Sequence, residues 1–436
     1  MKTPIDDFVK KYADSGAVRL HMPGHKGMGE TERLDITEIG GADSLYHAEG
    51  IIAESEANAT QLFGAPTFYS TEGSSQCIRA MLYLAALDAA RAGKKPRIAA
   101  GRNAHSTFVS AVALLDKDVD WLMSDGGDSY LSCPITPDFV EQYLEQNAPT
   151  ALYITSPDYL GNTVDIGGIA RACHSHGVLL LVDNAHGAYL KFLSPSRHPM
   201  DAGADMCCDS AHKTLPTLTG GAYLHVREGF AGEAKQALSL FGSTSPSYLI
   251  LASLDRTNRY LAEGYARRLA MFCAKIADVR ALLTKRGLEL WGDEPLKLTI
   301  APRSYGYTGR ELADLLCALG LVPEFSDPDC VVLMLSPDQD TTALEAVLKS
   351  LPRREGKKAA APKVCDLPQR IMTPRQAIMS PSELLPAGEC VGRVAAALTV
   401  GCPPAVPVVV SGERVDACHI PVLEYYGIRQ LRVVKE

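Results

Sequence analysis

The stretch SAHKT (Ser210–Thr214) comes just after the apolar run Met206–Cys208. A lysine that ends a buried strand is costly unless its amine does chemistry, because burial favours the neutral amine, which can form a Schiff base. About thirty residues upstream, the apolar run Leu179–Val182 leads straight into Asp183. Pyridoxal phosphate needs this pair, an aspartate for its pyridine nitrogen and a lysine for its aldehyde. We therefore predict a pyridoxal phosphate site built on Asp183 and Lys213.

Composition limits the class of protein. The chain has 436 residues, enough for two or three domains, and 46% hydrophobic and 22% charged residues are typical of a globular protein. The net charge of −8 argues against a nucleic-acid partner. No apolar run reaches the roughly twenty residues that span a membrane. The first residues, Met1–Asp7, contain acids and no apolar signal core, so we expect a cytoplasmic protein.

The twelve cysteines lie mostly in apolar runs, which is typical of buried free thiols rather than disulfides. The run Cys173-His174-Ser175-His176 looks like a metal-binding cluster. No CxxC pair with zinc spacing accompanies it, and a helix that ends at Gly177 would scatter the side chains around its axis. We therefore predict no metal site.

Helical periodicity alternates with short apolar stretches along the first part of the chain. We expect strands at 67–70, 97–100, 120–123, 151–155, 178–182, 204–208 and 221–226, and helices at 56–63, 73–90 and 166–175. This alternation predicts an α/β fold with a mostly parallel sheet covered on both faces. Ligands bind such sheets at the carboxyl ends of the strands, where Ser70, Thr155, Asp183 and Cys208 would converge.

Five segments are expected along the chain. Residues 1–20 form an N-terminal helical arm, with Ile5, Phe8, Val9 and Tyr12 at helical spacing, and residues 21–260 form the large cofactor-binding domain. One or two long helices over 248–283 lead into a small α/β domain at 261–351, with strands at 296–301 and 331–335 around a helix at 309–319. A polar linker at 352–364 precedes a C-terminal domain at 365–436.

A phosphate site is predicted where Ser70-Thr71-Glu72-Gly73-Ser74-Ser75 leaves a strand and opens a long helix. Backbone amides at a helix N-terminus bind anions, and Gly73 allows close approach while Ser74 and Ser75 add hydroxyls. A plain serine cap of the helix is the alternative. Ser210 could contribute another hydroxyl to the same phosphate.

Four residues are candidates for contact with the cofactor ring or the substrate. Asp183 would keep the pyridine nitrogen protonated, and Ala185 would pack its methyl group on one ring face. His105 would stack on the other face and meet the substrate carboxylate. His212 would orient the Schiff base or donate a proton to the substrate carbanion, with simple packing beside Lys213 as the alternative.

Together these motifs resemble the prokaryotic ornithine/lysine/arginine decarboxylases, a family of pyridoxal phosphate enzymes. The likeness rests on RLHMPGHKG (Arg19–Gly27), STEGSS (Ser70–Ser75), GRNAHST (Gly101–Thr107), SPDYLG (Ser156–Gly161), VDNAHGAY (Val182–Tyr189), DSAHKTLPTLTGGAYLH (Asp209–His225), GSTSPSY (Gly242–Tyr248) and CPPAVPVVVSGE (Cys402–Glu413). The motifs occur in the family's order and cover nearly the whole chain. The chain is similar to short members that lack a receiver-like wing domain.

The resemblance implies the aminotransferase fold of type I, a large domain with a mostly parallel seven-stranded sheet and small α/β C-terminal domains. Lys213 matches the Schiff-base lysine, Asp183 the pyridine partner and His105 the stacking histidine. Gly73, Ser74, Ser75 and Ser210 match the phosphate contacts. Ser243 or Thr244 matches a residue that reaches the phosphate of the neighbouring subunit, so a homodimer with shared active sites, or a higher oligomer, is implied.

Three departures from the family pattern leave substrate choice open. The family usually has Glu where Asn184 stands, an uncharged residue where Glu72 stands and Tyr where Cys402 stands. An extra carboxylate at Glu72 is unfavourable beside a phosphate unless it points away.

The implied reaction is α-decarboxylation of a basic amino acid to a polyamine-type amine, with arginine as the first expectation and lysine and ornithine open. Glu413 and Asp416 are candidates for binding the cationic side chain. An aminotransferase or lyase is an alternative, since Arg370 and Arg375 could bind an α-carboxylate. A non-catalytic regulatory homologue is a second alternative. A nicotinamide dehydrogenase is disfavoured, because no GxGxxG opens a βαβ unit.

Overall fold

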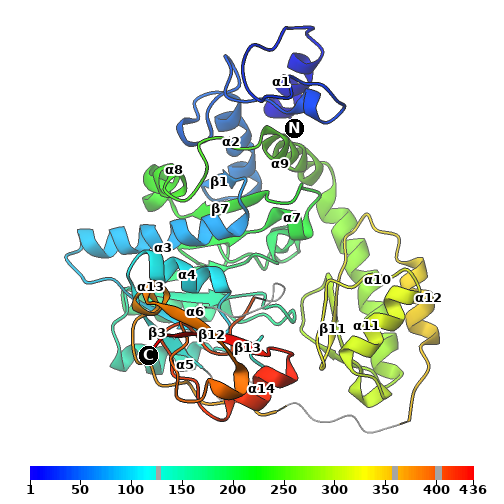
Figure 1. Ribbon diagram of the computed structural model, residues 1–436. Coiled ribbons are helices and arrows are strands. Elements are labelled where there is room, and N and C mark those ends of the chain that lie inside the picture. The colour runs from blue at the N-terminus through cyan, green and yellow to red at the C-terminus, as the bar shows by residue number, and fades with distance from the viewer. Residues whose placement is uncertain (124–128, 356–361, 398–404) are drawn as a thin grey trace. The chain divides into compact units, whose positions relative to one another are not determined.

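The computed structural model describes residues 1–123, 129–355, 362–397 and 405–436 (Figure 1). Part of the predicted linker, 356–361, and the first three residues of the C-terminal motif, Cys402–Pro404, lie outside the described residues. Within them, no helix is long and apolar enough to cross a membrane.

The central feature is a seven-stranded sheet in the order β1-β7-β6-β5-β4-β2-β3. Its strands are β1 (Thr67–Ser70), β2 (Arg97–Gly101), β3 (Asp118–Leu122), β4 (Ala151–Thr155), β5 (Leu179–Asp183), β6 (Met206–Asp209) and β7 (Ala222–Val226). β2 and β3 pair in parallel, as do β5 and β6, whereas β7 is antiparallel to β1 and β6. The predicted α/β class with a mostly parallel sheet is confirmed.

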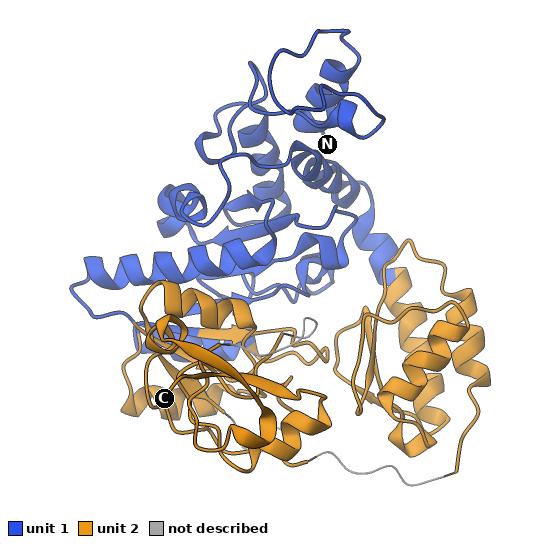
Figure 2. Cartoon of the chain, viewed as in Figure 1, with its two compact units in different colours: residues 1–96, 150–152, 166–270 blue, residues 97–149, 153–165, 271–436 orange. Residues whose placement is uncertain are grey.

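The chain forms two compact units, coloured separately in Figure 2. The first comprises residues 1–96, 150–152 and 166–270. Its helices are α1 (Pro4–Ala13), α2 (Ile51–Phe63), α3 (Gly73–Arg91), α6 (Ile166–Ser175), α7 (Ala211–Thr214), α8 (Ala231–Ser239) and α9 (Tyr248–Ala262). Helix α1 is the predicted arm, and its apolar side chains Ile5 and Val9 are buried.

The second unit comprises residues 97–149, 153–165 and 271–436, and α10 (Tyr265–Lys285) belongs to both. Its helices are α4 (Ser106–Leu114), α5 (Pro137–Gln146), α11 (Gly309–Ala318), α12 (Thr342–Ser350), α13 (Pro374–Met379) and α14 (His419–Tyr425). A four-stranded antiparallel sheet contains β8 (Glu289–Trp291), β9 (Lys297–Ala301), β10 (Phe325–Ser326) and β11 (Val331–Met334). A separate antiparallel pair consists of β12 (Ser382–Pro386) and β13 (Gln430–Val434). The small α/β elements predicted at 296–301, 309–319 and 331–335 are confirmed.

The early start of α2 and the division of the long helical region into two helices have identifiable reasons. Helix α2 begins at Ile51, five residues before the predicted start, because the Asp43 carboxylate accepts the N–H groups of Gly50 and Ile52 and so caps this end. The long helical region breaks into α9 and α10 around Gly264, which has a positive φ of 78° that few other residues adopt.

The two units interleave along the chain, since residues 97–149 and 153–165 belong with the C-terminal half. The boundaries proposed from the sequence, 1–20, 21–260, 261–351, 352–364 and 365–436, therefore stay a prediction about separable domains.

Candidate active site

The predicted phosphate loop lies at the start of α3. Gly73 has a φ of 71°, and its N–H donates to the carbonyl of Gly220 at 2.7 Å. A side chain at Gly220, whose φ is 98°, would come within 2.8 Å of the carbonyl of Thr71. Ser210 Oγ, at the start of α7, donates to Ser74 Oγ at 2.8 Å. Three loops thus meet at the N-terminus of α3, where amides and hydroxyls can bind an anion.

Glu72, the additional acidic residue in this loop, binds a single backbone N–H group. The Glu72 carboxylate accepts the N–H of Ser243. Ser243 and Thr244 are exposed, and Ser243 Oγ accepts the N–H of Ser245 at 3.1 Å. Glu72 therefore organises the Ser243–Thr244 turn, and a role for these residues at a neighbouring subunit's phosphate remains a prediction.

Asp183 ends β5 with a buried carboxylate, 3% exposed. Its Oδ1 accepts the N–H of Ala185 at 3.1 Å and the thiol of Cys208, on the neighbouring strand β6, at 3.7 Å. These contacts fix the carboxylate at the strand end, with the buried Ala185 two residues after it.

Lys213 lies in α7, half-buried, with its Nζ 3.1 Å from Nε2 of His186. His186 is buried and follows Asp183 by three residues in VDNAHGAY. The sequence pattern predicted no role for His186, although this residue lies within the motif VDNAHGAY. The contact brings Asp183, His186 and Lys213 to the carboxyl ends of the adjacent strands β5 and β6.

The contacts of His212 do not favour a proton-donating role. Its Nδ1 donates to the carbonyl of Gly221 at 3.0 Å. Burial lowers the pKa of His212, and the nearby Lys213 charge lowers it further against the opposing effect of the Gly221 hydrogen bond. A neutral ring whose only proton is held by a carbonyl suits the orienting role, one of the two roles predicted.

His105 belongs to the second unit, at the N-cap of α4. Its Nδ1 accepts the N–H of Thr107 at 3.1 Å, which fixes the ring beside the carboxyl end of β2. The next residue, Ser106, donates its N–H to the carbonyl of Ala405 at 2.8 Å, so the C-terminal motif packs beside this histidine. Its stacking on a cofactor ring stays a prediction.

Glu413 is unsuited to the substrate-binding role suggested for it. Both carboxylate oxygens accept from Arg102, at 2.8 and 2.7 Å, and both side chains are buried. The N–H of Val410 donates to Glu413 as well, at 2.7 Å. The carboxylate is occupied by a bidentate ion pair, because Arg102 would otherwise be a buried charge without a counter-ion. Asp416, by contrast, is exposed.

The two arginines considered for an aminotransferase lie near the start of β3 and the end of α4, whereas His105 lies near the end of β2 and the start of α4. Arg370 Nη1 lies 3.7 Å from Asp118, the first residue of β3, and Arg375 Nη1 donates to the carbonyl of Leu114 at the end of α4. The predicted site residue of this unit, His105, precedes α4 and follows the end of β2. These arginines therefore do not support an α-carboxylate clamp.

Comparisons with known proteins identify the family of this chain. The family model "Orn/Lys/Arg decarboxylase, major domain" matches residues 3–291, and the C-terminal domain model of the same family matches residues 357–433. An arginine decarboxylase of Halalkalibacterium halodurans is 29% identical over 494 aligned residues, covering 100% of this chain and 98% of that protein.

Solved structures extend the likeness to the fold. The constitutive lysine decarboxylase of E. coli has a TM-score of 0.78 at 18% identity, over 100% of this chain and 82% of that one. An alanine–glyoxylate aminotransferase from Nostoc sp. has a TM-score of 0.55 at 15% identity, over 68% of this chain and 85% of that one. The aminotransferase fold of type I is thus confirmed, and the chain belongs to the Orn/Lys/Arg decarboxylase family of pyridoxal-phosphate-dependent enzymes.

Proposed function

We propose that this protein decarboxylates a basic amino acid at its α-carbon, with arginine as the preferred substrate. The observation that carries the proposal is the meeting of Asp183, Lys213 and the Ser74–Ser210 hydroxyl pair around the carboxyl ends of β5 and β6. These groups are the ones that pyridoxal phosphate requires, at the sheet edge where α/β proteins bind ligands.

The donor set fits the cofactor from its phosphate to its aldehyde. The positive φ of Gly73 turns the chain into α3, and its N–H is held by the Gly220 carbonyl. The Ser74 and Ser75 amides and the Ser210 hydroxyl would then hold the phosphate beside Gly73. Asp183 would bind the pyridine nitrogen, and Lys213 would hold the aldehyde. Ala185 and His105 would cover the ring faces, and Ser243 or Thr244 would reach the partner's phosphate in a homodimer.

When bound, pyridoxal phosphate supplies a sink for the electron pair that the departing carboxylate leaves behind. The Asp183 carboxylate, at the end of β5, would stabilise positive charge on the pyridine nitrogen. Lys213 holds a proton at Nζ against His186 Nε2 and returns it to the substrate α-carbon. His212, held by Gly221, orients the turn that carries Lys213.

Arginine is proposed as substrate because relatives that match over the whole of this chain are named arginine decarboxylases. Lysine and ornithine are the other candidates in the family's substrate class. With Glu413 paired to Arg102, the exposed Asp416 remains as the candidate acid for the cationic side chain. A cytoplasmic homodimer that makes a polyamine-type amine completes the proposal.

A substrate panel tests the proposal. The purified protein with pyridoxal phosphate should release carbon dioxide from arginine faster than from lysine or ornithine, without forming a keto acid. Lys213→Ala should lose the yellow absorbance of lysine-bound cofactor and the activity. Lys191→Ala, which removes a lysine paired with Asp201, should keep both. Keto acid without carbon dioxide, or full activity in Lys213→Ala, would overturn the proposal.

A further inference from the structure

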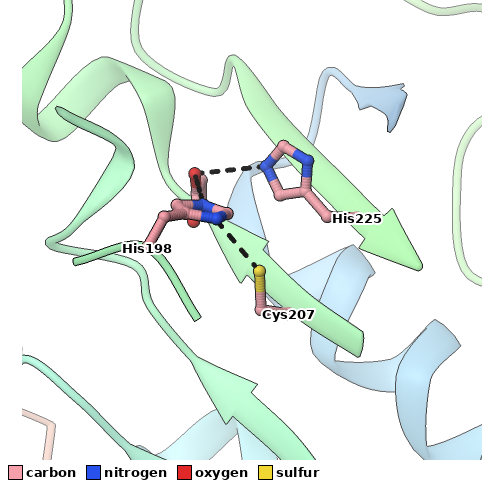
Figure 3. A group of neighbouring side chains, drawn as sticks. His198, Cys207 and His225 are labelled. Carbon is pink, nitrogen blue, oxygen red and sulfur yellow. Dashed lines mark hydrogen bonds and ion pairs between the residues drawn. The ribbon is translucent and has the colours of Figure 1, made fainter. Parts of the chain in front are cut away.

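A second group of titratable side chains lies in the first unit, on and near strands β6 and β7. His198, Cys207, Asp209 and His225 are fully buried, and one ligand-type atom of each lies within 4.8 Å of the others. Figure 3 shows the two imidazoles and the thiol converging from different segments. The two histidine Nε2 atoms each lie 3.1 Å from Asp209 Oδ2, and Cys207 Sγ lies 4.0 Å from His198 Nε2.

Hydrogen bonding assigns the protons in this group. The N–H of Met200 can only donate, and it lies 3.4 Å from His198 Nδ1, so Nδ1 accepts and Nε2 carries a proton. His225 Nε2 lies 3.1 Å from Asp209 Oδ2, which as a carboxylate oxygen can only accept, so this nitrogen carries a proton. Burial lowers the pKa of His225, which favours a neutral ring with its proton on Nε2. Both rings therefore present an N–H, rather than a lone pair for a metal, to Asp209.

Asp209 accepts a third hydrogen bond, from Asn184 Nδ2 to its Oδ1 at 2.6 Å. Burial alone would raise the pKa of Asp209, but His198 and His225 hold it well below its usual range. The carboxylate thus stays charged in the interior because three donors surround it.

The position of Asp209 joins the two halves of the site. Asp209 is the last residue of β6, and Ser210, the partner of Ser74, follows it. Its donor Asn184 directly follows Asp183 on β5. One buried carboxylate therefore connects the loop of the phosphate serine with the loop of the pyridine-binding aspartate.

We propose that Asp209 is a positioning residue that holds Ser210 and Asp183 at the spacing the cofactor needs, an inference that rests on the proposed function. Asn184 takes part in the same arrangement, because its side-chain amide donates to Asp209 Oδ1 at 2.6 Å. This hydrogen bond ties the loop after Asp183 to Asp209.

The test compares Asp209→Ala with Asp205→Ala. Asp205 is a matched control, because its carboxylate is also buried and has charged or polar donors: His174 at 3.0 Å, Arg227 at 2.8 Å and the Leu180 N–H at 2.7 Å. It precedes β6, however, at the end away from Ser210. Both variants lose a buried carboxylate, and only one loses the connection between the site loops.

Two readouts are measured on cofactor-free protein: hydrogen exchange of peptides that cover 183–189 and 209–215, and the dissociation constant for added pyridoxal phosphate. Asp209→Ala should exchange faster in both peptides and bind pyridoxal phosphate at least about tenfold more weakly. Asp205→Ala should change neither. If Asp209→Ala does not fold, Asp209→Asn, which keeps the side-chain volume, should show the same effects in smaller degree.

Equal effects in the two variants, or unchanged exchange and affinity in Asp209→Ala, would overturn the inference. One equivalent of bound transition metal in the purified wild-type protein, lost in Cys207→Ser, would also overturn it, because the rings would then bind a metal. A wild-type protein that does not bind pyridoxal phosphate would contradict the proposed function, and hydrogen exchange would still decide whether Asp209 orders the two loops.

Discussion

Lys213 Nζ lies 3.1 Å from His186 Nε2, so the lysine at the centre of the site has an imidazole as its neighbour. The imidazole is buried, and it lies three residues after Asp183 in the same loop. The pair thus links the position of the lysine to the loop that carries the aspartate.

His186→Gln should lower the turnover of carbon dioxide release by at least about tenfold, because general acid–base partners contribute factors of this size or more. The Michaelis constant should change less, since the contact is with Lys213 rather than with substrate. Steady-state kinetics over a pH series measure both values.

The control for this variant is His174→Ala, which removes an exposed histidine on α6 paired with Asp205. It should leave turnover within about twofold of wild type, as a surface substitution away from the site does. Unchanged turnover in His186→Gln would show that Lys213 moves its proton without the imidazole.

Glu413→Ala should lower the free energy of unfolding by about 3–5 kcal/mol, because it leaves Arg102 buried without its counter-ion. The preference for arginine over lysine should stay the same, since the carboxylate is fully used by Arg102 and the Val410 N–H. Urea unfolding and a two-substrate assay measure the two quantities.

Glu383→Ala is the comparison for this variant, since its partner Arg393 forms a more exposed ion pair of the kind that contributes about 1 kcal/mol or less. A stable Glu413→Ala protein with altered substrate preference would indicate that Glu413 binds the substrate side chain.

The local elements of this fold were predictable from the sequence. The predicted strands at 67–70 and 151–155 coincide with β1 and β4, because short apolar runs that end at polar residues have few alternatives to a buried strand. The place of Asp183, Lys213 and the Ser74–Ser210 pair at one sheet edge was also predictable, since carboxyl ends of neighbouring strands meet there, whereas their roles stay a prediction.

Long-range pairing was not predictable in this way. Arg102 and Glu413 are 311 residues apart, and only the folded chain shows that each is the other's counter-ion. Asp209, His198 and His225 converge because β7 runs antiparallel to β6, whereas the alternating pattern favoured parallel neighbours. His186 was visible in its motif, but spacing alone does not fix the direction of a side chain.

Asp255 should make stability depend on pH below neutrality. Burial raises its pKa from 3.8 to about 6, although it accepts hydrogen bonds from Ser55 and from the Asp6 and Ile5 N–H groups, and the Asp6 charge raises it further. Because the folded protein binds this proton more tightly, the stability contribution is present at low pH and is lost as the pH rises from about 4 to 6.

Asp255→Asn removes the titration while keeping the side-chain shape. Relative to wild type, the variant should gain stability between pH 4 and 7 by up to about 3 kcal/mol, measured by urea unfolding. Asp340→Asn should show the reverse trend, since hydrogen bonds from Thr342 lower the pKa of Asp340. A pH-independent difference between wild type and Asp255→Asn would show that Asp255 is ionised throughout this range.

The Ser74–Ser210 pair offers a direct measure of the phosphate site. Ser210→Ala should weaken binding of pyridoxal phosphate by about tenfold, because a hydrogen bond to a charged group contributes about 1.5–3 kcal/mol. Ser239→Ala, which removes an exposed hydroxyl bonded to its own helix, should have no effect on affinity.

The double variant Ser74→Ala/Ser210→Ala separates two explanations of that loss. The hydroxyls lie 2.8 Å apart, so if they bind one phosphate together, the second substitution should weaken affinity less than it does alone. Titration of cofactor-free protein with pyridoxal phosphate gives the four dissociation constants of this cycle. Strictly additive losses would mean that the serines act independently. Unchanged affinity in all variants would place the phosphate elsewhere, because loss of a hydroxyl that donates to a charged phosphate must be detectable.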